Sequence, residues 1–112
     1  MVKKNKKFWA HPTADVSFTS SIGAGTKIWN QSQVASGAVI GDKCVIGHNC
    51  LVCKGAKIGN EVKLESNIDV WDLVIIEDGV FVGPSVVFTN DPNPRARFPK
   101  SQFPQFGSWK KT

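Results

Sequence analysis

A six-residue repeat runs through most of this chain and constrains its fold more than any other feature. Every sixth residue from Val16 to Phe88 is a large aliphatic or aromatic side chain, and the residue two positions before each is small or β-branched. The large residues are Val16, Ile22, Ile28, Val34, Ile40, Ile46, Val52, Ile58, Leu64, Val70, Ile76, Val82 and Phe88. A period of six does not match the helical period of about 3.6 residues, and β-branched residues favour strands. The repeat therefore predicts short strands that each turn two side chains inward.

The glycines support this interpretation independently. Nine of the ten glycines fall at two of the six positions of the repeat: directly after the large residue, like Gly41, or two positions further on, like Gly25, where Asn49 and Asn67 also occur. A residue that needs a positive φ angle, or that has no room for a Cβ atom, recurs in this way when each repeat is one strand and one corner. Three repeats then close a triangular coil of 18 residues. The sequence predicts an all-β fold, a parallel β-helix of about four coils roughly 20 Å tall.

Charge divides the chain into three regions. Residues 1–14 hold four lysines and no acid, residues 89–112 hold five basic residues and one acid, and residues 15–88 carry five basic and eight acidic groups. The basic N-terminus is interpreted as a solvated tail or as a weak contact to nucleotide phosphates or an acidic surface, and the acidic body is not expected to bind nucleic acid. The expected division is a basic segment over 1–10, a β-helix domain over 11–88 and a loop or arm over 89–112.

The last region has four prolines and four aromatic residues but no hexapeptide phase. It is predicted either to dock through its aromatic side chains or to reach a neighbouring subunit. The chain shows neither a long apolar run that could cross a membrane nor a secretory signal, which predicts a cytoplasmic protein with no membrane partner. Its three cysteines are then expected to be reduced thiols.

Four sequence motifs resemble one enzyme family. HPTADV, GTKIW, EDGVFVGPSVVFTND and NPRAR lie within residues 11–97, and together they resemble the left-handed β-helix N-acetyltransferases that act on UDP- or dTDP-linked 3-amino sugars for surface polysaccharides such as lipopolysaccharide. This resemblance implies a left-handed β-helix, a homotrimer, and acetyl-CoA and a nucleotide-linked amino sugar bound between adjacent subunits. Related enzymes continue into further coils that help bind CoA. A non-catalytic trimeric module, as a truncated remnant or as one part of a split acetyltransferase, is therefore the alternative function.

The resemblance implies a catalytic position for Asn90, beside the reacting amine and thioester. Because residues 18 apart lie on neighbouring coils, Asp72 is expected next to Asn90, with Asp91 on the same corner. These acidic residues are candidates for binding the substrate, although Asp is also common at turns. Arg95 is a candidate partner for a phosphate of the sugar nucleotide, or else a solvated loop charge.

A second corner carries His48 and Asn67, which are predicted to complete the substrate site across a trimer interface. His48 could also act as a general base, as in other branches of the family, although the resemblance implies that this branch works without a strong base. Asn67 has a structural explanation as well, because it occupies the position of the repeat that needs a positive φ angle. Trp71 is predicted to pack in the trimer interface or to stack on a base.

Metal chemistry is not expected. Cys50 and Cys53 form an isolated CxxC, but the repeat turns Cys44 and Cys50 inward on different faces, so the three thiols should not converge on one ion. The related carbonic anhydrases need three zinc-binding histidines, and this chain has two histidines. An ice-binding solenoid would need a flat array of threonines, which the sequence lacks.

Overall fold

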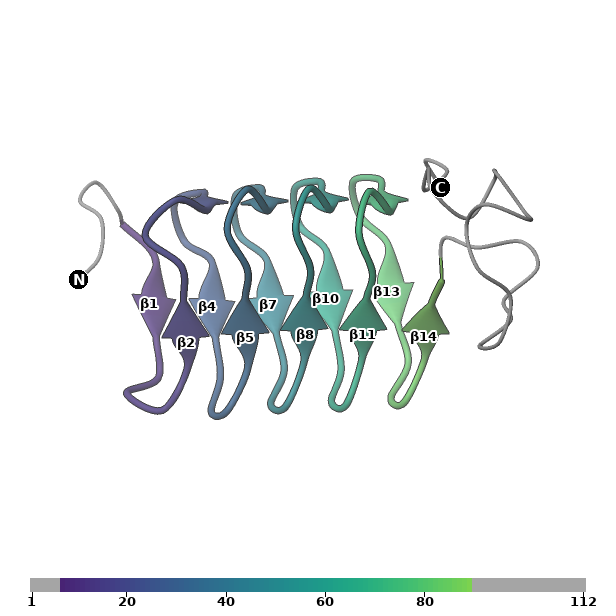
Figure 1. Cartoon of the computed structure of the whole chain (residues 1–112), viewed down its shortest axis with the longest axis horizontal. Helices are drawn as coiled ribbons and strands as arrows, with labels where there is room; N and C mark the ends of the chain where they lie inside the picture. The colour runs from purple at the N-terminus through teal and green to yellow at the C-terminus, as the bar shows by residue number, and fades with distance from the viewer. Residues whose placement is uncertain (1–6, 90–112) are drawn as a thin grey trace, which may run out of the picture.

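The computed structural model describes residues 7–89, which form a parallel β-helix (Figure 1). Its strands are β1 (Trp9–Ala10), β2 (Asp15–Val16), β3 (Ser21–Ile22), β4 (Lys27–Ile28), β5 (Gln33–Val34), β6 (Val39–Ile40), β7 (Val45–Ile46), β8 (Leu51–Val52), β9 (Lys57–Ile58), β10 (Lys63–Leu64), β11 (Asp69–Val70), β12 (Ile75–Ile76), β13 (Phe81–Val82) and β14 (Val87–Phe88). The predicted all-β fold of about four coils is confirmed, and it is consistent with a left-handed hexapeptide-repeat helix.

The strands stack into three parallel sheets that form the faces of a triangular prism. Sheet A has the order β1-β4-β7-β10-β13, sheet B the order β14-β11-β8-β5-β2, and sheet C the order β12-β9-β6-β3. Each strand pairs in register with the strand 18 residues away, as Leu64 pairs with both Ile46 and Val82. Strand β1 precedes residue 11, where the sequence placed the start of the β-helix domain. Residues 18 apart therefore share a column on every face and corner.

The interior contains the two columns of side chains that the repeat predicted. Ile40, Ile58 and Ile76 line the wall of sheet C and are at most 5% exposed. We call the coils near the N-terminus the lower coils and those near the C-terminus the upper coils. The second column changes from small polar residues in the lower coils, such as Thr26 and Ser32, to larger aliphatic residues in the upper coils. Both hydroxyl groups are fully buried and hydrogen bonded, so neither pays the desolvation penalty of an unpaired buried group.

The corners use left-handed backbone conformations at a fixed position. Gly25, Gly37, Gly55 and Gly79 have φ angles of 74–78°, and Asn49 and Asn67 have 57° and 60°, as the sequence predicted. The same position is occupied with positive φ by residues that the repeat did not single out: Gln31, Lys43, Glu61, Leu73 and Ser85. Ladder bonds stabilise most of these corners, since the amide of the positive-φ residue donates to a carbonyl of the coil below, as Asn67 N does to His48 O at 3.0 Å. Gln31 N donates instead to Thr13 Oγ1 at 3.0 Å.

The other glycine position follows a different rule. Gly23, Gly41 and Gly59 lie beneath the side chains of Asp42, Asn60 and Asp78, whose Oδ1 atoms would overlap any Cβ built on the glycines. Each Oδ1 accepts a hydrogen bond from a backbone amide of the coil below, at 2.8–3.0 Å. Glycine is needed here because an upper side chain occupies the space of the missing Cβ, and not because of a positive φ angle.

Candidate functional site

The predicted site residues that fall within residues 7–89 lie on two edges of the prism. We call the corners from sheet A to sheet B (residues 11–14, 29–32, 47–50, 65–68 and 83–86) the A–B edge, and those from sheet B to sheet C (17–20, 35–38, 53–56 and 71–74) the B–C edge. His48 and Asn67 lie on neighbouring coils of the A–B edge, whereas Asp72 lies on the B–C edge. The predicted site residues Asn90, Asp91 and Arg95 fall outside residues 7–89.

Strand β11 separates Asp72 from the other two residues. It runs from the corner that holds Asn67 to the corner that holds Asp72, so within one subunit the two side chains lie at opposite ends of a sheet-B strand. The structure therefore brings His48 and Asn67 together on one edge and leaves Asp72 on another. A site that used all three would need a second subunit to supply one edge.

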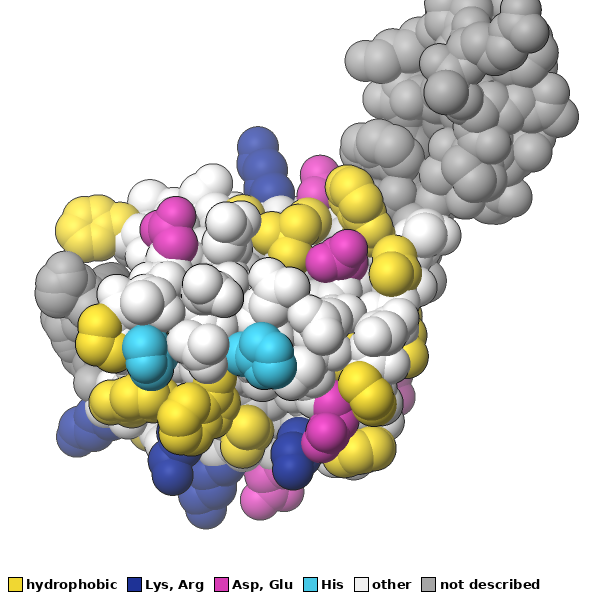
Figure 2. Space-filling model, turned by 90° about the horizontal axis from the view of Figure 1, so that it is seen from below, with side chains coloured by type: hydrophobic (Ala, Val, Ile, Leu, Met, Phe, Trp, Pro, Cys, Tyr) yellow, Lys and Arg dark blue, Asp and Glu magenta, His cyan; other side chains and the backbone are white. Residues whose placement is uncertain are grey.

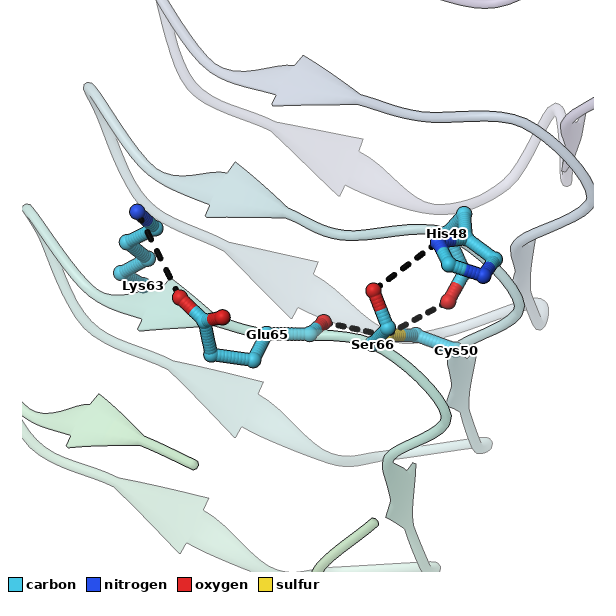
Figure 3. A network of polar contacts seen from close by, with 5 residues as sticks. All are labelled: His48, Cys50, Lys63, Glu65 and Ser66. Atoms are coloured by element: carbon cyan, nitrogen blue, oxygen red, sulfur yellow. Dashed lines mark hydrogen bonds and ion pairs between the residues drawn. The ribbon is translucent and has the colours of Figure 1, made fainter. Parts of the chain in front are cut away.

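His48 has a defined partner on the next coil. Its Nδ1 atom forms a hydrogen bond of 2.9 Å with Ser66 Oγ, eighteen residues away, and Figure 3 shows the two side chains turned toward one another. The backbone carbonyl of His48 accepts a hydrogen bond from the amide of Asn67, which fixes the corner backbone. Because Nδ1 is engaged with Ser66, Nε2 is the ring nitrogen that can meet a ligand. His48 is exposed, so that nitrogen is accessible.

Asn67 belongs to a ladder of amide side chains. Asn49 Nδ2 donates to Asn67 Oδ1 at 2.7 Å, and both residues have positive φ angles. A shallow groove of about 330 Å³ runs beside them, lined by Gln31, Gln33, Asn49, Cys50, Leu51, Asn67 and Asp69. The positive φ angle and the hydrogen bond from Asn49 explain Asn67 structurally, and a contact to substrate would be an additional role.

A second groove of about 330 Å³ lies on the sheet-A side of His48, and the sequence did not predict it. It is lined by Trp29, Asn30, Val45, Gly47, His48, Lys63, Leu64, Glu65 and Ser66, and we call it the Trp29 groove. An ion pair of 3.4 Å joins Lys63 Nζ to Glu65 Oε2 at its upper side (Figure 3). Figure 2 views the A–B edge directly and shows the histidines (cyan) between a hydrophobic patch (yellow) and a region of other side chains and backbone (white), with charged side chains farther to either side.

An aromatic cluster borders this groove at the lower coils. Trp29 is 41% exposed and makes an edge-on contact with Trp9, with ring centroids 5.0 Å apart. Trp9 makes a second edge-on contact with His11 at 6.1 Å. The sequence carried a signal for the groove, since His48 and Ser66 are eighteen apart and Trp29, Gly47 and Glu65 form one column. Periodicity gave no indication of how these side chains would turn.

The cysteines are buried within the described part of the chain. Cys44 Sγ donates to Gly59 O at 3.0 Å and Cys50 Sγ donates to Glu65 O at 3.2 Å. Both thiols are therefore hydrogen bonded to the carbonyl of a corner residue in the next coil. Burial raises the pKa of both thiols above the usual value. Burial and the nearby carboxylate of Asp72 raise the pKa of Cys53 to about 11. Over residues 7–89, no group of three or more His, Cys, Asp or Glu residues could hold a metal ion.

We expect the three thiols to resist alkylation by iodoacetamide at pH 8 in the folded protein, because the reactive thiolate is suppressed. The thiol of Cys53 is neutral in the folded state until about pH 11, whereas its unfolded pKa is 9.0, so its contribution to stability is present below pH 9 and is lost as the pH rises toward 11. Mass spectrometry with and without urea measures the labelling. Rapid labelling of Cys53 without urea would contradict the buried, protonated thiol.

Comparisons with known proteins agree with the repeat. Residues 19–54 match the family model described as bacterial transferase hexapeptide (six repeats). Among solved structures, the chain is similar to the acetyltransferase domain of PglB from Neisseria gonorrhoeae FA1090, with 22% identity and a TM-score of 0.41, over 71% of this chain and 48% of that chain. The chain thus spans about half the length of that solved chain. No curated protein matches it.

No helix among residues 7–89 is long and apolar enough to cross a bilayer.

The A–B edge presents two open grooves that flank the corners carrying His48 and Asn67. The corner that carries His48 falls within the segment that matches the family model, whereas the corner that carries Asn67 lies beyond it. The repeat over residues 19–54 is therefore similar to that of the bacterial transferase hexapeptide family.

Proposed function

We propose that the chain is an acetyl-CoA-dependent N-acetyltransferase that acts on the amino group of a nucleotide-linked amino sugar in surface polysaccharide biosynthesis. The observation that carries this proposal is the exposed pair of His48 and Ser66 beside a groove on a hexapeptide β-helix. The match of residues 19–54 to a transferase family model supports acyl transfer. The motifs GTKIW and EDGVFVGPSVVFTND support an amino sugar as the acceptor.

The proposed chemistry uses a fixed geometry and a proton acceptor. The amine lone pair attacks the thioester carbonyl of acetyl-CoA, a C–N bond forms, and the C–S bond breaks. His48 Nε2 is the described group best placed to accept the proton from the amine and return it to the departing thiolate, while Ser66 holds the imidazole ring. Asn90 stays the predicted position beside the reacting atoms, where an amide could donate to the developing oxyanion.

A homotrimer with sites between subunits is part of the same proposal. His48 and Asn67 occupy the A–B edge and Asp72 the B–C edge, at opposite ends of the sheet-B strands. Packing the A–B edge of one subunit against the B–C edge of the next would bring the two sets together. Acetyl-CoA and the sugar nucleotide would then lie between adjacent prisms, and the mass of the native assembly measures the oligomeric state.

Turnover of the full chain with acetyl-CoA and UDP- or dTDP-linked 3-amino sugars tests the proposal directly. We expect acetylated sugar nucleotide by mass spectrometry, and we expect His48→Gln to lower kcat by about 100-fold, since general base catalysis contributes at least that much. His11→Gln is the matched control, because His11 lies on the same edge but outside the Trp29 groove. Its kcat should be unchanged.

Two results would contradict the enzyme. A folded trimer that neither turns over these substrates nor binds CoA would leave the non-catalytic β-helix module, a remnant or one part of a split enzyme, as the function. A monomer in native mass spectrometry would contradict a site shared between subunits. Equal losses in His48→Gln and His11→Gln would remove His48 from the chemistry and leave the transferase in place.

A further inference from the structure

We infer that the Trp29 groove binds the ring of a saccharide, with one face of the pyranose against the Trp29 indole. The inference rests on the proposed function only for the identity of the sugar, which under that function is an amino sugar. The argument comes from three properties of the groove: a preorganised aromatic wall, a size suited to one ring with a glycine in the floor, and a polar rim whose ion pair offsets its charges.

The aromatic wall is held in place before a ligand arrives. Trp29 is packed edge-on against Trp9, and Trp9 against His11, so the indole has neighbours on the lower side. It is nonetheless 41% exposed, which leaves ring surface open to the groove. An apolar ring face that is fixed and accessible favours a flat partner with its own apolar face, which the C–H groups of a pyranose provide.

The floor of the groove includes a glycine. Trp29, Gly47 and Glu65 occupy one column on successive coils, and Gly47 contributes no side chain between the other two. The groove measures about 330 Å³, which lies at the small end of the range for small-molecule sites. A ligand of a single ring suits a groove of this size.

The glycines at the same position of the edge between sheets C and A are covered by side chains. Above Gly23, Gly41 and Gly59, the side chains of the next coil occupy the space. The three atoms nearest to a Cβ built on Gly47 are instead backbone atoms of Glu65 and Leu64. The floor of the groove at Gly47 is therefore backbone, and it lies beside the indole of Trp29.

The rim of the groove suits hydroxyl groups better than phosphates. Lys63 and Glu65 are joined as an ion pair, so their charges offset one another. Asn30, His48 and Ser66 add hydrogen-bond donors and acceptors at the corner. A carboxylate beside the only ammonium of the groove disfavours a phosphate, whereas alternating donors and acceptors match the hydroxyl groups of a sugar. A ring bound here also places its substituents beside His48.

Titration of the ¹⁵N-labelled full chain with glucosamine, and separately with UDP, tests the inference through the indole N–H signals of its four tryptophans. We expect the Trp29 signal to shift with glucosamine and not with UDP. Trp29→Ala should weaken glucosamine binding by about tenfold. Phe81→Ala is the matched control, since Phe81 is a 62% exposed aromatic residue on strand β13 that does not line the Trp29 groove, and this variant should bind glucosamine as the unaltered chain does.

The outcomes separate this inference from the proposed enzyme. Glucosamine that fails to bind, or that binds without moving the Trp29 signal, overturns the saccharide groove even where acetyl transfer is observed. An equal response of Trp29 to UDP overturns it too, because the wall would then stack on a base. Binding of glucosamine at Trp29 without any turnover keeps the groove and rejects the transferase.

Discussion

Replacing Leu64 by alanine should lower the free energy of unfolding by about 3 to 4 kcal/mol. Leu64 is fully buried in the wall of sheet A, where it stacks between Ile46 and Val82. Its neighbours belong to stacked strands whose backbones are hydrogen bonded on both sides, so they cannot move inward to close the cavity. The cost therefore combines the lost transfer free energy with an unrelaxed void.

Urea unfolding followed by far-ultraviolet circular dichroism, at a fixed protein concentration, measures this effect. Leu51→Ala is the matched control because Leu51 points outward from sheet B and is only half-buried. We expect that control to cost less than about 1 kcal/mol. Equal losses for the two variants would mean that the inward and outward columns are not distinguished in the folded protein.

The second large effect is expected from Gly47→Ala, which should cost about 3 kcal/mol. A Cβ atom at this position would overlap the backbone carbonyl of Glu65 on the next coil. That carbonyl belongs to the coil that pairs with Gly47, whose amide donates to Leu64 O at 2.9 Å. Neither backbone can shift without breaking ladder bonds, so the strain cannot be relieved by a rotamer change.

Gly83→Ala is the control for this substitution. Gly83 occupies the same position of the same edge, two coils higher, and a Cβ there would meet no described atom within 4 Å. Neither glycine has a positive φ angle, so the two substitutions differ mainly in steric overlap. The control should change stability by less than about 0.5 kcal/mol. A comparable loss in both variants would show that close approach of the coils is not what requires glycine at Gly47.

The fold could be predicted from the sequence because its core obeys one period. The inward columns, the 18-residue pairing and the corner positions all follow from spacing, as the wall of Ile40, Ile58 and Ile76 shows. The handedness could not be derived from the period and came from the family resemblance. Spacing also predicted that glycines would mark corners, but it could not separate the positive-φ position of Gly25 from the close approach at Gly41.

The candidate site could be predicted only in part. Column position was enough to place His48 and Asn67 on one edge and Asp72 on another. The bond between His48 and Ser66 and the exposed face of Trp29 depend on side-chain rotation, which a repeat does not encode. Leu73 in a left-handed corner was also unforeseen, because Leu carries no signature of that backbone conformation. The roles of Asn90, Asp91 and Arg95 stay predictions.

The ladder in which Asp42, Asn60 and Asp78 fill the space above glycines limits how such a chain can change length during evolution. A deletion or duplication of one hexapeptide would preserve the alternation of inward and outward residues. It would also rotate every later column to the next edge, and the glycines would lose the side chains that fit above them. Only gain or loss of a whole turn keeps both relationships, so genes for this architecture should vary in steps of eighteen codons, with other insertions confined to corner loops.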